Sequence, residues 1–261
     1  MTGLIFPTKP KIIKETDTEG VFEIENLYTG YGLTLGNALR RVLLSSLKGF
    51  AITSVKIKGV SHEFSVIDGV LEDVIQIILN LKKIRVKTYT PGPHTLTLSV
   101  KGEKKVKASD IQKNSNIEIV TPDIHIATLT DKKSELEMVL TVEEGIGYSP
   151  AETRQKEKLP VGTISLDVVF SPVRKVNYEV ENMRVGERTD YNRLRLYIET
   201  DGTMAPSIAL KQAAEILQEH FKIVADLPIP EQKETEKTEE EKKISKKTTK
   251  AKEEKTKKGK K

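Results

Sequence analysis

Residues 34–49 have the sequence TLGNALRRVLLSSLKG, and the pattern of this stretch decides the fold. Its apolar residues recur with the spacing of a helix and form a face wider than one packing partner needs. They are Leu35, Ala38, Leu39, Val42, Leu43, Leu44 and Leu47. Thr34 suits the N-cap, because its hydroxyl can accept a backbone N–H of the first turn, and Gly49 suits the stop. We therefore predict an amphipathic helix between these two residues.

Two adjacent arginines, Arg40 and Arg41, lie on the polar side of this predicted helix, with Leu39, Val42 and Leu43 as near neighbours. An arginine offers fixed donors and a weakly hydrated plane, so its presentation beside apolar surface suits a protein interface. The alternative is an ordinary amphipathic core helix with solvated arginines. The pattern alone favours that alternative.

Strands are predicted in several other parts of the chain from alternating or short apolar patterns. The predicted strands and strand-rich blocks are residues 11–27, 51–58, 84–142, 163–170, 175–181 and 194–199. The strand over 51–58 changes face along its length, as a twist or a bulge would allow. The block 84–142 has few long apolar runs, so we expect a small core there. Residues 144–160 are polar and are expected to form an irregular loop.

A second helix is predicted to open at Asp68, because apolar residues keep helical spacing from there to Leu81. Lys82 and Lys83 then lie in its last turn. Cations at the carboxyl end of a helix interact well with the helix dipole. That role alone is enough to explain both lysines.

The last predicted helix spans residues 206–226, and Pro206 suits its first turn. Ala205 stands before it and has no side-chain oxygen. This start therefore lacks the N-cap acceptor, which is worth about 1 kcal/mol, unless Thr203 or Ser207 supplies one.

The charge of the chain is concentrated at its end. Residues 231–261 hold 13 of the 43 basic and 8 of the 38 acidic side chains, which accounts for the whole net charge of +5. A neutral remainder argues against a nucleic-acid footprint over the whole body. The tail has almost no apolar residues and is expected to be disordered. It either contacts phosphate weakly and salt-sensitively or serves only to keep the chain in solution.

No catalytic or metal-binding group is evident. The four histidines His62, His94, His125 and His220 lack ligand spacing, and there is no cysteine. Ser45 and Ser46 have no neighbouring histidine, and the glycines of residues 30–32 do not match a phosphate-binding loop. No secretory signal or membrane span is found, so we expect a soluble cytoplasmic protein without a cofactor. A scaffold would have such a sequence.

Motifs in fixed order over residues 1 to about 227 resemble the bacterial RNA polymerase alpha subunit family. The motifs are Tyr28–Ser46, Gly59–Ser65, Gly69–Val74, Asn80–Lys82, Gly147–Ala151, Phe170–Val173, Arg188–Asp190 and Glu199–Thr203. The resemblance implies a non-catalytic subunit of the DNA-directed polymerase, a nucleotidyltransferase that transcribes DNA. It also implies that Mg²⁺ is held by the catalytic subunits and that this chain carries no cofactor.

The architecture that the resemblance implies is α+β. A discontinuous dimerisation domain would consist of residues 1–48 and 172–228, a β-rich domain of residues 49–171 would be inserted into it, and a disordered tail of residues 229–261 would follow. The chain would form a homodimer, and this dimer would be the platform on which the large beta and beta-prime subunits assemble.

The resemblance also implies which residues make these contacts. Contacts with the beta subunit are expected at Arg40, Arg41 and Leu44. Contacts with beta-prime are expected at Lys82, Leu166, Val173, Arg188 and Arg193. Dimer contacts are expected at Leu35, Leu39, Val42, Leu43, Leu217 and Phe221. Leu166 and Val173 are equally well explained as core residues of strands.

We expect the chain to depart from the family in one respect, because the lysine-rich tail leaves no residues for the small carboxy-terminal DNA-binding domain. We expect the lysine-rich tail to supply weak, sequence-independent attraction to DNA instead. Two other classes of function stay open. A free-standing dimeric DNA-binding protein would need a basic folded surface. An enzyme with a site in the β-rich block would need a pocket with convergent titratable groups.

Overall fold

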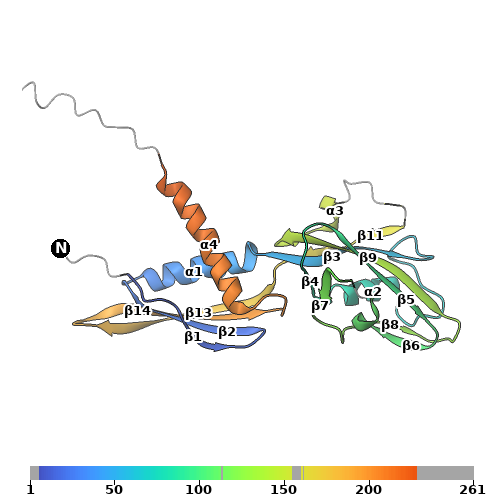
Figure 1. The fold of residues 1–261 in the computed structure, drawn as a ribbon, viewed down its shortest axis with the longest axis horizontal. Helices are drawn as coiled ribbons and strands as arrows, with labels where there is room; N and C mark the ends of the chain where they lie inside the picture. The colour runs from blue at the N-terminus through green and yellow to red at the C-terminus, as the bar shows by residue number, and fades with distance from the viewer. Residues whose placement is uncertain (1–5, 113, 155–159, 161, 228–261) are drawn as a thin grey trace, which may run out of the picture. The chain divides into compact units, whose positions relative to one another are not determined.

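The structure is a computed structural model that describes residues 6–112, 114–154, 160 and 162–227. Helices and strands are mixed and sheets predominate, which confirms the predicted α+β class (Figure 1). The chain divides into two compact units, one that ends at His220 and one that begins at Phe221. The predicted disordered tail, residues 229–261, lies outside the described residues. Among the described residues, none of the helices is both long and apolar enough to cross a membrane.

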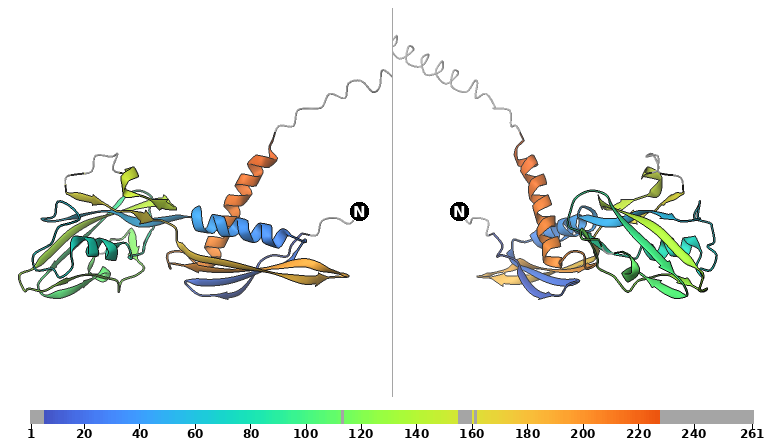
Figure 2. Two further views of the ribbon diagram at one scale, coloured as in Figure 1. Left: turned by 180° about the vertical axis from the view of Figure 1, so that it is seen from behind. Right: turned by 45° about the vertical axis from the view of Figure 1, so that its right-hand side comes forward.

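The first antiparallel sheet combines both ends of the first unit. Its strands, in spatial order, are β1 (Lys11–Glu15), β2 (Glu19–Leu27), β14 (Arg188–Thr200) and β13 (Val173–Val185). Helix α1 (Tyr31–Ser45) packs on one face of this sheet, and both views in Figure 2 show this arrangement. Helix α4 (Pro206–Ala225) adds Ala209, Leu210 and Ala213 to the same core. The predicted strand over 11–27 is therefore a hairpin, because its alternation continues across the turn at residues 16–18.

Helix α1 begins and ends earlier than predicted. It starts after Gly30, whose φ of 85° lies in the left-handed region, and Thr34 is inside it. Its last residue is Ser45, and Gly49 is not its stop but part of strand β3. A side chain at Gly49 would place Cβ 1.8 Å from the Phe170 carbonyl oxygen. Glycine is needed there for the close approach of two chain segments.

The second sheet is formed by the middle of the chain. Its strands, in spatial order, are β11 (Thr163–Ser165), β3 (Lys48–Ile57), β9 (Glu135–Ile146) and β5 (His94–Lys101). Three two-stranded pairs accompany it: β4 (Val86–Thr88) with β7 (Ile117–Ile119), β6 (Lys104–Lys107) with β8 (His125–Leu129), and β10 (Tyr148–Ser149) with β12 (Val168–Val169). The pairing of β3 with β9 shifts between Ile52 and Ser54, which confirms the expected irregularity. Part of the predicted 144–160 loop is regular, since β10 and the short helix α3 (Ala151–Arg154) lie within it.

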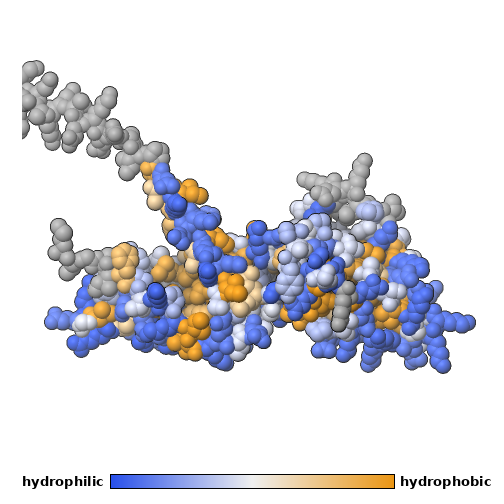
Figure 3. Space-filling model, viewed as in Figure 1, coloured by the Kyte–Doolittle hydropathy of each residue, from blue (hydrophilic) through white to orange (hydrophobic). Residues whose placement is uncertain are grey.

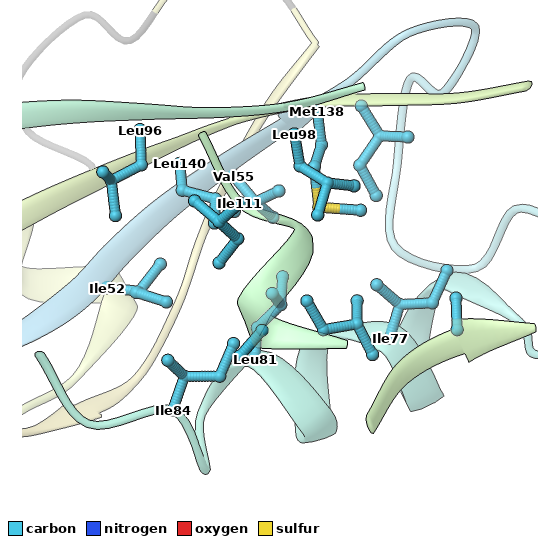
Figure 4. Close-up of a cluster of buried hydrophobic side chains, with 14 of the residues drawn as sticks. Ile52, Val55, Ile77, Leu81, Ile84, Leu96, Leu98, Ile111, Met138 and Leu140 are labelled. Atoms are coloured by element: carbon cyan, nitrogen blue, oxygen red, sulfur yellow. The ribbon is translucent and has the colours of Figure 1, made fainter. Parts of the chain in front are cut away.

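The core under this sheet is large, and the expectation of a small one was wrong. Helix α2 (Val74–Leu81) directs Ile77 and Leu81 toward Leu98 and Leu140 of the sheet (Figure 4). All four of these side chains are almost fully buried. The core is assembled from many short apolar segments, including the one-turn helix η1 (Ala108–Asp110). For this reason no single long apolar run reveals it.

The start of α2 also differs from the prediction. Asp73, not Asp68, is its N-cap, and the carboxylate Oδ1 accepts the backbone N–H of Gln76 at 2.7 Å. Val70 lies outside the helix and forms an isolated bridge with Leu129. Apolar spacing continued across the loop and extended the predicted helix by more than a turn.

Candidate protein–protein interface

Helix α1 is buried along one row only. Gly32, Gly36, Leu39 and Leu43 face the first sheet, and Leu43 is fully buried. The two glycines allow close packing, because a Cβ on Gly36 would be 2.7 Å from Cδ2 of Tyr178. This row leaves the rest of the helix surface outside the core of the protomer.

Two of the residues predicted as dimer contacts belong to the buried row. Leu39 and Leu43 are 6% and 0% exposed and pack in the core beneath α1. Burial within the protomer leaves these two side chains little surface to offer a second copy. Leu35 and Val42 are half-buried at the edge of the same core. Their remaining surface is still available to a partner.

The opposite side of α1 carries the predicted beta contacts. Arg40, Arg41 and Leu44 are all exposed. Within the described part of the chain neither guanidinium takes part in an ion pair. Two large exposed side chains at the start of the helix, Tyr31 and Leu33, escaped prediction because the helix was expected to begin at Thr34. The exposed face therefore combines two cations with apolar surface.

Helix α4 leaves apolar surface exposed beyond its first turns. Leu217 is half-buried against the first core. In the second unit Phe221 is 63% exposed, and Ile223, Val224 and Leu227 are exposed to a similar degree. Figure 3 shows apolar side chains between hydrophilic ones along this helix. Exposed apolar patches of this kind mark interaction surfaces.

The residues predicted to contact beta-prime lie in different environments. Lys82 is half-buried at the carboxyl end of α2, with Nζ 3.7 Å from Oδ2 of Asp167. Leu166 and Val173 are only 2% and 5% exposed and belong to the two cores. Their burial supports the alternative that they are core residues.

Arg188 is held in a fixed orientation at the end of the β13–β14 hairpin. Its guanidinium carbon lies 5.2 Å from the ring centre of Tyr28 and 5.4 Å from that of Tyr191. Its Nε and one terminal nitrogen donate to Asp190 at 3.0 and 2.6 Å. These bonds, and one from Thr29, hold the pKa of the Asp190 carboxyl well below its usual range. Half of the Arg188 side chain remains exposed beside this cluster.

Arg193 is occupied within the first sheet. Its guanidinium nitrogens lie 3.3 Å from Glu25, 3.6 Å from Glu181 and 3.9 Å from Glu23. The side chain is one third exposed. A cation surrounded by three carboxylates of its own protomer has less to offer a partner than Arg188.

The amino end of α4 is capped by a residue that the sequence did not indicate. Oε1 of Glu15, on β1, accepts the backbone N–H of Ser207 at 2.9 Å. Neither of the predicted substitutes has this role, since Thr203 donates instead to Asp201 at 2.6 Å. No local pattern connects residues so far apart in the sequence, so there was no signal to find.

Titratable groups of the described residues do not meet the requirements of a metal site. The part of the chain that the structure describes contains no group of three or more potential ligands among His, Cys, Asp and Glu. His125 Nε2 lies 2.7 Å from the Glu72 carboxylate, which also accepts two bonds from Thr128. These bonds outweigh burial and lower the pKa of Glu72. The arrangement ties the loop before α2 to strand β8.

These features define an α+β protein with two hydrophobic cores. The first core lies between the first sheet, α1 and α4. The second core lies under the second sheet, which the middle of the chain forms. Residues 55–171, almost the whole of the second core, match the family described as the RNA polymerase Rpb3/RpoA insert domain. The chain is 48% identical over 223 residues to the DNA-directed RNA polymerase subunit alpha of Oceanobacillus iheyensis, covering 84% of this chain and 71% of that one.

Further relatives give the same result. The DNA-directed RNA polymerase subunit alpha of Roseiflexus castenholzii is 49% identical over 218 residues, covering 84% of this chain and 67% of the relative. That of Alkaliphilus oremlandii is 46% identical over 242 residues, covering 88% and 76%. The chain therefore belongs to the family of DNA-directed RNA polymerase alpha subunits, and the resemblance found in the sequence is confirmed.

Proposed function

We propose that this chain is the homodimerising assembly subunit of a DNA-directed RNA polymerase and that it works in the cytoplasm without a catalytic site of its own. In this proposal residues 1–48 and 172–228 form the dimerisation domain, and residues 49–171 form the inserted domain. The large beta and beta-prime subunits supply the nucleotidyl-transfer chemistry and hold Mg²⁺. The dimer provides the surface on which they meet.

The observation that supports this function most directly is the division of α1 into two faces. One row of residues lies in the core of the protomer, and the other side exposes Tyr31, Leu33, Leu44 and two arginines. A helix that served only its own core would bury its apolar side chains and leave polar ones outside. An apolar surface next to arginines has the composition of a protein interface.

We assign the partners as follows. The exposed apolar side chains of α4, with Phe221 foremost, and the outer edges of Leu35 and Val42 meet the second copy. Arg40, Arg41 and Leu44 meet beta. Lys82 and Arg188 meet beta-prime, whereas Leu166 and Val173 support that surface from within the cores. Interfaces of this obligate kind are extensive and apolar.

The dimer is tested by light scattering on the purified chain. The wild type is expected to have twice the mass of one chain, and Phe221→Asp is expected to shift it toward the mass of one chain because a carboxylate would be buried. Lys222→Ala, at the next exposed position of the helix, is the control and should remain dimeric. A wild-type chain that stays monomeric at high concentration would overturn the proposal.

We further propose that the lysine-rich tail attracts DNA weakly once the polymerase is assembled. Deletion of residues 231–261 would then lower the affinity for DNA and flatten its dependence on salt concentration, because fewer counterions are released. Polymerase assembled with the shortened chain is compared with the complete enzyme over a salt series. Identical slopes would show that the tail has no such role.

A further inference from the structure

Two pockets lie side by side on the surface of the second core. The larger has a volume of about 550 Å³ and lies between α2, the loop before it and strand β11. The smaller has a volume of about 210 Å³ and lies between the end of α2 and the β10–β12 pair. Lys82 and Asp167 line both pockets, so this ion pair forms the ridge between them.

The larger pocket is open, and large apolar side chains line part of it between polar and charged ones. Phe64 is 75% exposed and Leu79 is 52% exposed at its rim, and Ile75 is also exposed. Its base includes Ile164 and Leu166, both of which are buried in the core. Large apolar side chains gathered around a cavity are an unfavourable surface in water and are typical of a site for a partner's side chain.

The smaller pocket contains a cation whose hydrogen bonds are incomplete. Nε of Arg85 is buried and has no hydrogen-bond partner among the described residues. The Asp201 carboxylate is 3.6 Å away, and its Oδ1 already accepts two bonds from Thr203. One terminal nitrogen of Arg85 reaches the Val169 carbonyl oxygen at 3.5 Å, the limit for such a bond. Burial lowers the pKa of the Arg85 guanidinium, and Asp201 only partly opposes this effect.

Lys82 is in a similar position on the ridge. Its distance of 3.7 Å from Asp167 is that of an ion pair and is too long for a hydrogen bond. Oδ1 of Asp167 accepts the backbone N–H of Ala151. The ridge and the smaller pocket thus present two cations, Lys82 and Arg85, each of which faces a carboxylate oxygen at more than hydrogen-bond distance. A further carboxylate could accept hydrogen bonds from both cations.

We propose that the two pockets together bind one segment of the beta-prime subunit, in which an apolar side chain is followed by an aspartate or glutamate. The inference rests on the proposed function and specifies the chemistry of its Lys82 contact. The apolar side chain fills the larger pocket against Leu79. The carboxylate enters the smaller one and accepts bonds from Arg85 and Lys82, where a guanidinium offers paired donors of fixed geometry.

A free anion fits the site less well than such a segment. An inorganic phosphate would satisfy Arg85 but would leave the larger pocket, with its exposed Phe64 and Leu79, empty. The two pockets share a wall, so a single short stretch of protein reaches both. The adjacent lysine, Lys83, lines neither pocket and donates instead to Asn80 at 3.1 Å. It therefore provides a matched control.

The test measures binding of the full chain to purified beta-prime in the presence of beta. Arg85→Gln is expected to weaken binding about thirtyfold or more, since it leaves a buried carboxylate without its partner. Leu79→Asp is expected to weaken it about thirtyfold as well, as for a central apolar contact. Lys83→Ala should bind as the wild type does. A cross-linker at Tyr148 should capture a beta-prime peptide with an apolar residue followed by an acidic one.

Each outcome has a defined meaning. Binding of beta is measured in parallel and must be unchanged in every variant. If Arg85→Gln no longer binds beta, the test uses Arg85→Lys instead, which keeps the charge but not the paired donors. The inference is overturned if the Arg85 variant or Leu79→Asp binds beta-prime with the affinity of the wild type. The proposed function survives that result if Lys82→Ala still weakens binding of beta-prime. If Lys82→Ala also binds normally, the beta-prime assignment itself falls. Competition by inorganic phosphate without these effects would point to an adventitious anion site and would likewise overturn the inference.

Discussion

The Glu15 carboxylate accepts the backbone N–H of Ser207 and thereby caps α4 from a strand near the other end of the chain. Ala205, at the N-cap position, has no side chain that could do this. A negative charge at the start of a helix also interacts favourably with the helix dipole. One residue of β1 therefore helps to fix where the last helix begins.

Glu15→Ala is expected to lower the free energy of unfolding by about 1 kcal/mol, because the first turn of α4 loses its acceptor. Denaturant unfolding followed by circular dichroism measures this change. Asp17→Ala, in the adjoining turn, is the control and should have little effect. Equal stability of the two variants would show that solvent caps the helix just as well.

Gly36→Ala is expected to destabilise the protein although alanine is the better helix former. The added Cβ would lie 2.7 Å from Tyr178 and 3.0 Å from Leu194. Overpacking of this kind costs about 1–3 kcal/mol, which exceeds the gain of about 1 kcal/mol in helix propensity. Unfolding curves of Gly36→Ala and of Asn37→Ala, an exposed neighbour, are compared. A Gly36→Ala variant more stable than the wild type would mean that α1 can move away from the sheet.

Asp190→Asn is expected to remove a contribution to stability that depends on pH. Its hydrogen bonds lower the pKa of Asp190 in the folded state, so the carboxylate stabilises the fold above its ordinary pKa of about 3.9. This contribution declines as the pH falls from there toward the lower folded-state pKa. Unfolding midpoints of the variant and the wild type should differ most near neutral pH and converge in acid. If the difference between the two unfolding midpoints does not change with pH, the effect comes from the shape of the side chain and not from its charge.

Arg41→Ala is expected to fold and dimerise but to lose the beta subunit. Its guanidinium is exposed beside apolar surface, and truncation of an arginine at such a position typically costs about 2 kcal/mol or more of binding free energy. Co-purification of beta with the variant is the measurement. Lys56→Ala, an exposed cation on β3, should recover normal amounts of complex. Full recovery with Arg41→Ala would move the contact to another surface.

Sequence periodicity located α1 and α4 well but could not determine their orientation. The apolar pattern of α1 is broad, and which row faces the sheet depends on Gly32 and Gly36, whose role appears only when Tyr178 and Leu194 are beside them. Leu39 and Leu43 were therefore predicted at a dimer contact although they lie in the core. Local patterns report how apolar a face is, not what covers it.

The predicted boundaries of helices and strands were wrong where an apolar pattern continued across a turn. The alternation of residues 11–27 hid a hairpin, and apolar spacing before Asp73 hid the true start of α2. The candidate sites show the same limit. Arg85 gave no signal, because its significance depends on Asp201, more than a hundred residues away. Only an assembled fold brings such groups together.

The pairing of β2 with β14 has a consequence for synthesis of the chain. Every residue of the second core lies between Ala51 and Phe170, so that core can close while the ribosome is still translating the remainder. The first core must wait for residues 173–213, which are made after all residues of the second core. The nascent chain therefore carries α1 with Leu39 and Leu43 uncovered until strands β13 and β14 have been made.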